Sequence, residues 1–222
     1  PIADLIDGQV QGYESLVRWI MPTGELVPPI RFLPFIEQGP LIAELDALVL
    51  RQSIAALESM SPHLFVSVNI SARSIGSDEY AQHLREIIEE SGIDPTRLHL
   101  EVTETDLLDS SPATAERMRA IASMGARWYV DDFGTGYSSI SHLRDLPISG
   151  LKLDVSFTRG IGAGDPNSIT LAHALAGMAQ GLGLDTVAEG VETEVERATL
   201  SAQGWRRGQG WLYGAAQALT PA

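Results

Sequence analysis

The 222-residue sequence contains no cysteine, which excludes a disulfide framework and any metal site built on thiolates. Basic residues are few: 15 Lys and Arg stand against 29 Asp and Glu, so the formal net charge is −14. This excess of acid argues against binding to duplex DNA or RNA and against direct contact with an anionic membrane. No apolar run approaches the roughly 18 residues of a membrane span, and the N-terminus lacks the pattern of an export signal.

Short β-type runs alternate with longer amphipathic stretches along the whole chain. The β-type runs are rich in Val, Ile, Leu and aromatic residues and cover 13–20, 64–70, 98–103, 127–131, 150–155, 184–188 and 209–213. Between them, apolar residues recur at helical spacing, as Leu41, Leu45 and Leu48 show. Ser111-Pro112 and Asp165-Pro166 each pair a capping side chain with proline at the first helical position.

This alternation, with no break in composition, predicts a single α/β domain built on one parallel sheet. Seven or eight strand–helix units are about what closes a (β/α)8 barrel, and we expect that architecture. An open doubly wound sheet is the alternative. We expect residues 1–222 to be one domain taken from a longer protein, because Pro1-Ile2 leads directly into strand-like sequence.

Polar residues stand at the ends, or on one face, of runs that are otherwise apolar: Glu14, Asn69, Glu101, Asp131, Asp132, Lys152 and Glu189. In a parallel barrel the C-terminal strand ends converge on one mouth, where catalytic side chains gather. Each residue alone is more simply a solvated loop residue or a helix cap, so the argument depends on the set. Five carboxylates at one mouth would protonate or recruit metal, and oxygen ligands favour Mg²⁺ or Mn²⁺ over Zn²⁺.

Asp131 and Asp132 are adjacent, so their side chains point to opposite faces unless the chain turns there. The following Phe133-Gly134-Thr135-Gly136 predicts such a turn, after which the pair could hold two ions with one Asp bridging. The alternative is an Asp-rich turn with a helix cap. The segment also resembles a phosphate loop, with Ser138 or Ser139 beginning a helix, but it lacks the Lys-Ser/Thr of a nucleotide P-loop.

Two further residues have interior positions. Lys152 lies between Leu151 and Leu153, so strand alternation points it into the barrel, where it could orient or help to deprotonate a water. The alternative is a buried ion pair without a catalytic role. His99 shares a strand face with Glu101, and we expect a hydrogen-bonded interior histidine rather than a metal ligand.

Taken together, the motifs of this chain resemble those of the EAL-domain family of cyclic di-GMP phosphodiesterases. They occur in the family's order over essentially the whole chain and read YESLVRW, FLPFIEQG, SVNISA, LEVTET, VDDFGTGYSS, LKLD, AEGVET and QGWLYG. Two positions depart from the family's pattern. Ser15 stands where the family name has alanine, and Ala216 stands where proline is usual; neither is a candidate metal ligand.

The resemblance implies a TIM-type barrel with one antiparallel strand, and two divalent cations, Mg²⁺ or Mn²⁺, with Ca²⁺ inhibitory. It implies hydrolysis of cyclic di-GMP to linear pGpG in bacterial second-messenger signalling. It also assigns roles by position: metal ligands at Glu14, Asn69, Glu101, Asp131 and Asp132; catalytic roles at Lys152, Glu189 and Asp132, with Glu104 holding the loop after Asp132; and substrate contacts at Arg18, Leu16 and Gln209.

The resemblance further implies a homodimer, covalent linkage to sensory or GGDEF-type domains, and a cytoplasmic location, including the cytoplasmic part of a membrane-anchored protein. Two other functions compete with the enzyme. One is a catalytically silent receptor for cyclic di-GMP, and the other is a partner-docking domain whose acidic mouth is vestigial. Receptors of this family usually lack several metal ligands, whereas every ligand position of this sequence is filled.

Overall fold

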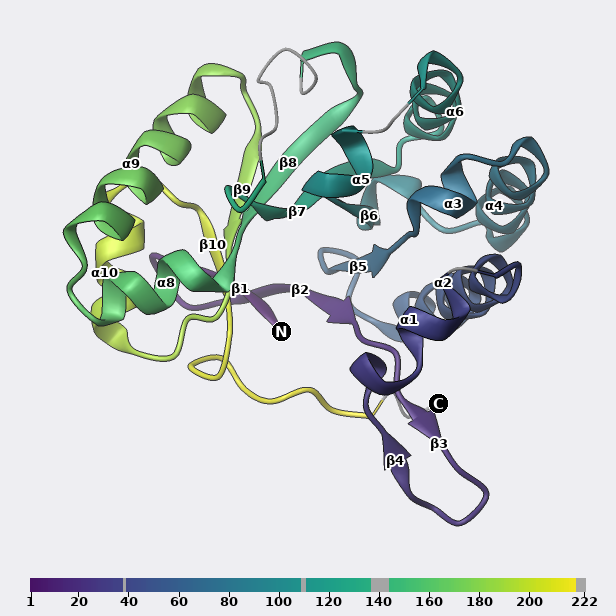
Figure 1. Ribbon diagram of the computed structural model, residues 1–222, viewed down its shortest axis with the longest axis horizontal. Helices are drawn as coiled ribbons and strands as arrows, with labels where there is room; N and C mark the ends of the chain where they lie inside the picture. Colours follow the sequence, from purple (N-terminus) through teal and green to yellow (C-terminus); the bar gives the residue numbers. More distant parts are fainter. Residues whose placement is uncertain (38, 109–110, 137–143, 219–222) are drawn as a thin grey trace.

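The computed structural model describes residues 1–37, 39–108, 111–136 and 144–218. In this part of the chain, eight strands form a closed barrel with helices around it (Figure 1). Around the barrel the order is β1 (Ile2–Asp4), β10 (Arg207–Gln209), β9 (Asp185–Ala188), β8 (Ile148–Leu153), β7 (Arg127–Phe133), β6 (Leu98–Thr103), β5 (Phe65–Asn69) and β2 (Val10–Ser15), which pairs again with β1. The barrel prediction is confirmed, and the open sheet is excluded.

Strand β1 runs antiparallel to both of its neighbours, whereas the other paired barrel strands are parallel. The chain turns back directly after β1, where Asp4 N donates to Gln9 O at 3.0 Å and Gly8 has a φ of 73°. A connection this short can only join antiparallel strands. The expected antiparallel strand is therefore β1.

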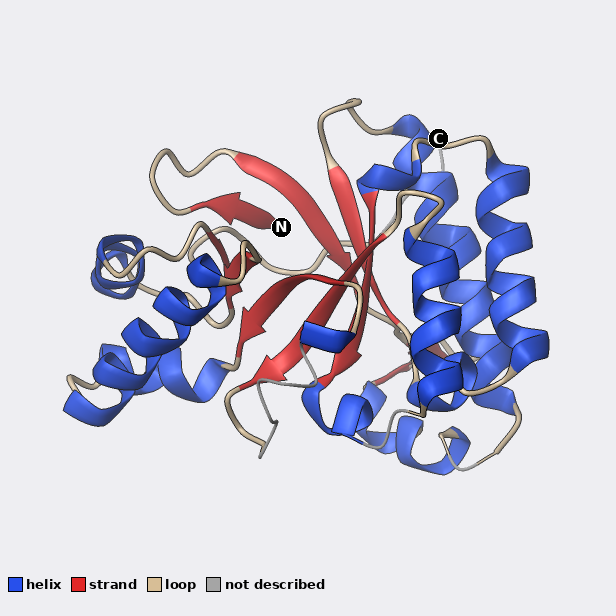
Figure 2. Cartoon of the chain, turned by 90° about the horizontal axis from the view of Figure 1, so that it is seen from above, coloured by secondary structure: helices blue, strands red, loops and turns tan. Residues whose placement is uncertain are grey.

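The helices cover the outside of the barrel, as Figure 2 shows. They are α1 (Leu33–Ile36), α2 (Leu41–Ser59), α3 (Ala72–Ile75), α4 (Asp78–Ser91), α5 (Glu104–Leu108), α6 (Pro112–Ala122), α8 (Val155–Gly162), α9 (Pro166–Gly181) and α10 (Glu194–Ala202), with 3₁₀ turns η1 (Pro29–Arg31) and η2 (Pro95–Arg97). Ser111 and Asp165 cap α6 and α9 as predicted. Among the described residues, no helix is long and apolar enough to cross a membrane.

Two predicted strands were wrong at their ends. The run over 13–20 is divided: β2 stops at Ser15, and β3 (Trp19–Ile20) pairs with β4 (Leu26–Val27) in a separate hairpin that projects from the barrel (Figure 1). Only Gln209 of the run over 209–213 lies in a strand, because β10 ends there and the chain then turns against Val191. A Cβ at Gly210 would overlap the Val191 backbone, so this turn requires glycine. Apolar composition alone does not show where strand pairing stops.

Stacked rings fill the N-terminal half of the barrel interior. The His99 ring stacks between Phe65 and Tyr129, with centroids 4.0 and 4.6 Å away. Adjacent strands contribute Gly12 and Gly150, where a Cβ would overlap the Phe65 and Tyr129 rings. The interior position of His99 is confirmed, but its buried Nδ1 has no hydrogen-bond partner among the described residues. Burial, followed by the charge of Arg207, lowers the pKa of His99 to about 3, so the ring is neutral.

Candidate metal and active site

Polar side chains from successive strands meet in the C-terminal half of the barrel. Neighbouring strands bring them to nearby levels of the barrel. Asn69 is paired in register with Glu101, and Asp131 is paired with Thr103, two residues after Glu101. Because alternate residues of each strand face the interior, one inward position per strand reaches this ring. Its members are Glu14 on β2, Asn69 on β5, Glu101 on β6, Asp131 on β7, Lys152 on β8, Glu189 directly after β9 and Gln209 on β10.

Lys152 lies at the centre of the ring with no exposure to solvent. Its Nζ lies 2.7 Å from Glu189 Oε1, 2.9 Å from Glu101 Oε2, 3.1 Å from Asp131 Oδ1 and 3.7 Å from Glu14 Oε1. Burial alone would lower the pKa of Lys152, but these carboxylates raise it well above its usual value. The side chain is therefore a buried ammonium, which needs anionic partners to remain charged.

Two amide side chains turn their NH₂ groups towards Glu14. Asn69 Nδ2 donates to Glu14 Oε1 at 2.9 Å, and Gln209 Nε2 donates to Glu14 Oε2. Burial would raise the pKa of Glu14, but Lys152 and these two donors outweigh burial and lower it. Glu14 is therefore a carboxylate. It bonds to the amide nitrogens of Asn69 and Gln209 and not to their amide oxygens. Gln209 Oε1 is buried and accepts no hydrogen bond from the described residues.

The carboxylates form two overlapping groups, each able to hold a metal ion. Ligand oxygens of Glu14, Glu101 and Asp131 lie within 4.8 Å of one another, and so do those of Asp131, Asp132 and Glu189. Asp131 belongs to both groups, and its buried Oδ1 accepts no hydrogen bond from the described residues although Lys152 lies nearby. A buried carboxylate oxygen that has an ion pair but no hydrogen bond, within an all-oxygen donor set, fits a hard divalent cation. When all five carboxyls are ionised, they and the one ammonium leave four negative charges, which two such ions would neutralise.

The backbone at Asp132 explains how two adjacent residues approach one site. Asp132 has a φ of 53°, the only positive φ of a non-glycine residue in the described part of the chain. The pairing of β7 with β8 shifts register between Val130 and Phe133. This bulge redirects one residue, so that Asp131 and Asp132 both reach the second group. The predicted turn is present at Gly134, which has a φ of 102° directly after β7, and the bulge at Asp132 precedes it.

Burial, and after it the neighbouring carboxylates, raises the pKa of two of these carboxyls. Burial, together with Glu14 and Asp131, raises the pKa of Glu101 well above its usual value despite Lys152. Burial and the neighbouring carboxylates likewise raise the pKa of Glu189 to about 7. A divalent ion held in either group would lower both values, since a nearby positive charge favours the carboxylate.

Glu104 holds the loop that follows Asp132. It is 3% exposed, and its Oε2 accepts hydrogen bonds from Gly134 N at 2.8 Å and Gly136 N at 3.1 Å. These two N–H groups are therefore not available to a phosphate, which weakens the comparison of this loop with a phosphate loop. The helix start expected at Ser138 or Ser139 lies outside the described residues.

Arg18 and Leu16 lie on the exposed segment after β2, outside the ring. Leu16 is 42% exposed, and the Arg18 guanidinium donates to Val17 O at 2.8 Å. No ion pair of the described residues includes Arg18. Asp154, for which no role was predicted, caps α8 and helps to raise the pKa of Asp132 after the larger effects of burial and Asp131. A signal was present, because Asp154 belongs to the same predicted run as Lys152 and directly follows β8.

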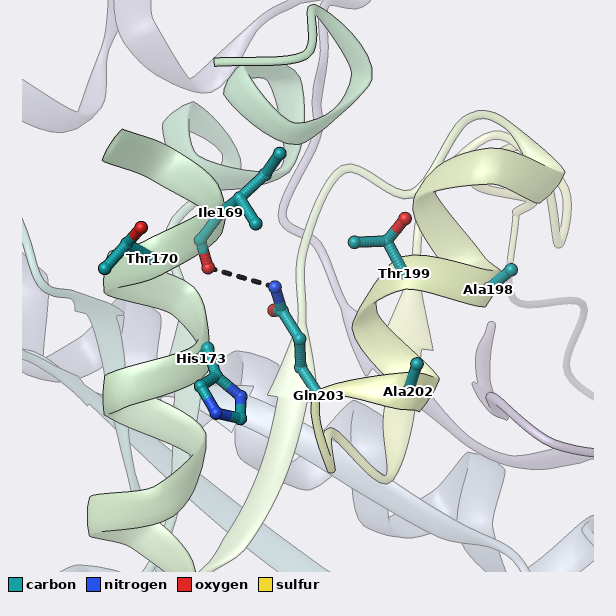
Figure 3. Close-up of a pocket in the computed structure, with 7 residues that line it drawn as sticks. All are labelled: Ile169, Thr170, His173, Ala198, Thr199, Ala202 and Gln203. Carbon is teal, nitrogen blue, oxygen red and sulfur yellow. Dashed lines mark hydrogen bonds between the residues drawn. The ribbon is translucent and has the colours of Figure 1, made fainter. Parts of the chain in front are cut away.

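A groove away from this ring lies between α9 and α10 and encloses about 640 Å³ (Figure 3). Gln203 crosses it and donates to Ile169 O at 2.9 Å. The lining residues are Ile169, Thr170, His173, Ala198, Thr199, Ala202 and Gln203. None of them is a carboxylate, so this groove does not compete with the ring as a cation site.

The fold and the site define a TIM-type barrel with a carboxylate-rich mouth. The chain belongs to the EAL domain family, whose model matches residues 1–216. It is 38% identical over 217 residues to the cyclic di-GMP phosphodiesterase NbdA and 37% identical over 224 residues to the cyclic di-GMP phosphodiesterase PA2567, both of Pseudomonas aeruginosa. These alignments cover 96% and 100% of this chain, but 28% and 38% of the two relatives.

The fold also matches that of a solved structure. The complex of PaMucR phosphodiesterase with c-di-GMP matches with a TM-score of 0.90 at 32% identity, over 97% of this chain and 88% of that one. The chain spans less than two fifths of the length of the two curated relatives named above, so the similarity concerns only part of each.

Proposed function

We propose that this domain hydrolyses one phosphodiester bond of cyclic di-GMP to give linear pGpG, using two divalent cations, Mg²⁺ or Mn²⁺. The observation that carries the proposal is the pair of overlapping oxygen groups that share Asp131. The names of NbdA and PA2567, and the cyclic di-GMP bound to PaMucR, support the substrate. The filled ligand set favours the enzyme over a silent receptor or a docking domain.

In this proposal Glu14, Asn69, Glu101 and Asp131 would hold one ion, and Asp131 and Asp132 would hold the other. Such a pair supplies Lewis-acid stabilisation of the phosphate and lowers the pKa of water towards neutrality. Glu104 acts indirectly, by keeping the loop after Asp132 in place.

Glu189 and Lys152 act on the attacking water. The Glu189 carboxylate would accept a proton from the water, because it lies in the second oxygen group beside Asp131 and Asp132. Lys152 Nζ, 2.7 Å away, orients this carboxylate and remains an ammonium. The water oxygen forms the new bond to phosphorus as the bond to the leaving ribose oxygen breaks. That oxygen takes up a proton from solvent and Glu189 releases its proton to solvent, so protons balance over the cycle.

The substrate contacts come from the rim. Arg18, whose exposed guanidinium has only a backbone partner among the described residues, binds a substrate phosphate. Leu16 and Gln209 contact the nucleotide beside it, Leu16 from the exposed segment and Gln209 from β10.

The direct test incubates the protein at micromolar concentration with cyclic di-GMP and Mn²⁺ and follows pGpG by chromatography. We expect linear product with Mn²⁺ or Mg²⁺ and none after EDTA treatment. Ca²⁺, which accepts looser coordination, should support nucleotide binding and inhibit turnover. Calorimetric binding of cyclic di-GMP without any linear product would instead establish the receptor.

We further propose that residues 1–222 are one EAL domain of a longer, cytoplasmic chain that carries sensory or GGDEF-type domains and works as a homodimer. The length of the curated relatives supports the additional domains. Light scattering on the 222-residue chain tests the dimer, for which a monomer at all concentrations would be the contrary result.

A further inference from the structure

Helix α2 supplies a buried carboxylate to the segment that follows Asn69. Asp46 on α2 is 6% exposed, and its Oδ2 accepts hydrogen bonds from Ser71 N at 3.0 Å, Ser71 Oγ at 2.8 Å and Ser74 Oγ at 2.8 Å. Ser71 is also the N-cap of α3 and accepts from Ser74 N. One buried oxygen therefore holds the whole start of α3 against α2.

This attachment is two residues from Asn69 along the chain. Ile70 between them is buried, and its N–H donates to Glu101 O at 2.8 Å. Asn69 itself is exposed at the end of β5, so little side-chain packing holds it. Its direction towards Glu14 depends on its backbone, which Ile70 fixes to β6 and Ser71 fixes to α2.

Helix α2 makes a second contact beside Glu14, the hydrogen-bond partner of Asn69. Ser53 is fully buried, and its Oγ lies 2.8 Å from the Oγ of Ser15, the residue after Glu14. Asp46 and Ser53 are seven residues apart on α2, which is two turns, so they share one helix face. That face contacts both strand ends that carry Glu14 and Asn69.

We propose that Asp46 is a positioning residue for the Glu14–Asn69 pair and that Ser53 assists it from the same face of α2. This inference rests on the proposed metal role of Glu14 and Asn69. Asp46 is in neither of the two metal-holding groups of the described residues, so its effect on a bound ion must pass through the backbone at Ser71. Partners that orient metal ligands in this way typically change metal affinity when they are altered.

The test compares Asp46→Asn with Asp165→Asn in the 222-residue protein. Asp165 is a matched control, because it also accepts from the N–H and hydroxyl of one serine at a helix start, at α9. Calorimetry with Mn²⁺ gives the affinity of each ion, and amide hydrogen exchange without metal reports the attachment at Ser71. We expect Asp46→Asn to weaken one of the two ions about 10-fold and to speed exchange at Ser71. Asp165→Asn should do neither.

Wild-type Mn²⁺ affinity in Asp46→Asn, or an equal loss in Asp165→Asn, would overturn the positioning role while leaving the proposed function intact. No Mn²⁺ binding by the wild-type protein would overturn both. If Asp46→Asn does not fold, Ser71→Ala removes the hydroxyl half of the same attachment. The proposal then requires Ser71→Ala to lose Mn²⁺ affinity, by less than the loss expected for Asp46→Asn. Wild-type Mn²⁺ affinity in Ser71→Ala would contradict the proposal.

Discussion

Lys152 and Glu189 form the closest ion pair of the ring, with Nζ and Oε1 2.7 Å apart. Lys152 is fully buried, and three further carboxylates lie within 4.0 Å of the same ammonium. One cation therefore compensates several anions that would otherwise repel each other in a medium of low polarity. Its removal should affect stability as well as catalysis.

Lys152→Met should leave the ring carboxylates without their internal cation. Removing one partner of a buried pair costs about 3–5 kcal/mol, so we expect a large loss in the free energy of unfolding at pH 7 in EDTA. Saturating Mn²⁺ should restore part of it, because an ion that binds only the folded state stabilises that state. Urea unfolding with and without Mn²⁺ measures the loss in the free energy of unfolding and its recovery. Arg144→Met, in a surface ion pair, is the control and should cost at most about 1 kcal/mol.

Glu189→Gln removes the proposed proton acceptor and preserves its shape. We expect cyclic di-GMP binding to remain and turnover to fall about 100-fold or more, as when general-base help is lost. Lys152→Ala should do the same to turnover. Single-turnover rates, with binding measured separately by calorimetry, give the two quantities. Glu194→Gln, at the exposed start of α10, serves as the control, and a wild-type rate in Glu189→Gln would remove Glu189 from the mechanism.

Asp131→Asn and Glu14→Gln should differ in how many ions they remove. Asp131 belongs to both oxygen groups, whereas Glu14 belongs to one. We therefore expect Asp131→Asn to weaken both Mn²⁺ ions and Glu14→Gln to weaken one. Electron paramagnetic resonance of a Mn²⁺ titration counts the bound ions. Two tightly bound ions in Asp131→Asn would contradict the shared position.

Gly150→Ala should overpack the barrel interior. The new Cβ would overlap the Tyr129 ring, which is itself stacked on His99 and cannot move freely. Overpacking of this kind costs about 1–3 kcal/mol. Gly177→Ala is the matched control, because a Cβ there meets no atom and the helical position favours alanine. Thermal unfolding should therefore show a lower Tm for Gly150→Ala, with an unchanged or higher Tm for Gly177→Ala; equal values for the two variants would refute the packing argument.

Asp185 should make stability depend on pH at the acid end. Its Oδ2 accepts from Tyr129 Oη at 2.8 Å and from Arg207 Nη1. Burial would raise the pKa of Asp185, but Arg207 and the Tyr129 hydroxyl outweigh it and lower the pKa. An unfolded Asp has a pKa of about 3.9, so this stabilisation is complete above about pH 5 and is lost as the pH falls through the lower folded value.

Asp185→Asn should therefore be less stable than the wild-type protein by a constant amount from pH 5 to pH 7. The difference should shrink as the pH falls below about 4. Urea unfolding across this range gives the comparison, and a difference that stays constant down to pH 3 would be the contrary finding.

The sequence predicted the barrel and the residues of its mouth because both leave local signals. Asn69 ends an apolar run, Lys152 interrupts one, and each stands out against its immediate neighbours. The predicted ends of β2 and β10 were wrong because no local signal marks them. Trp19 and Trp211 continue an apolar pattern, and only the partner strand shows that the pairing has stopped.

The bulge at Asp132 and the three hydrogen bonds at Asp46 left no such signal. The sequence shows two adjacent aspartates but not that the second has a positive φ, because that conformation is imposed where β7 meets β8. Asp46 resembles any polar residue of an amphipathic helix until α2 packs beside Ser71.

Local sequence accounts for the alternation of strands and helices, the helix caps, and the supply of oxygen ligands without thiolates. These depend on the periodicity and chemistry of residues close together in the chain. Three relationships appear only in the folded protein: the Lys152 ammonium lies within 4.0 Å of four carboxylates, Asp131 belongs to both oxygen groups, and α2 contacts two strands that carry ligands. Those relationships join residues far apart in sequence, and their distances exist only once the barrel has closed.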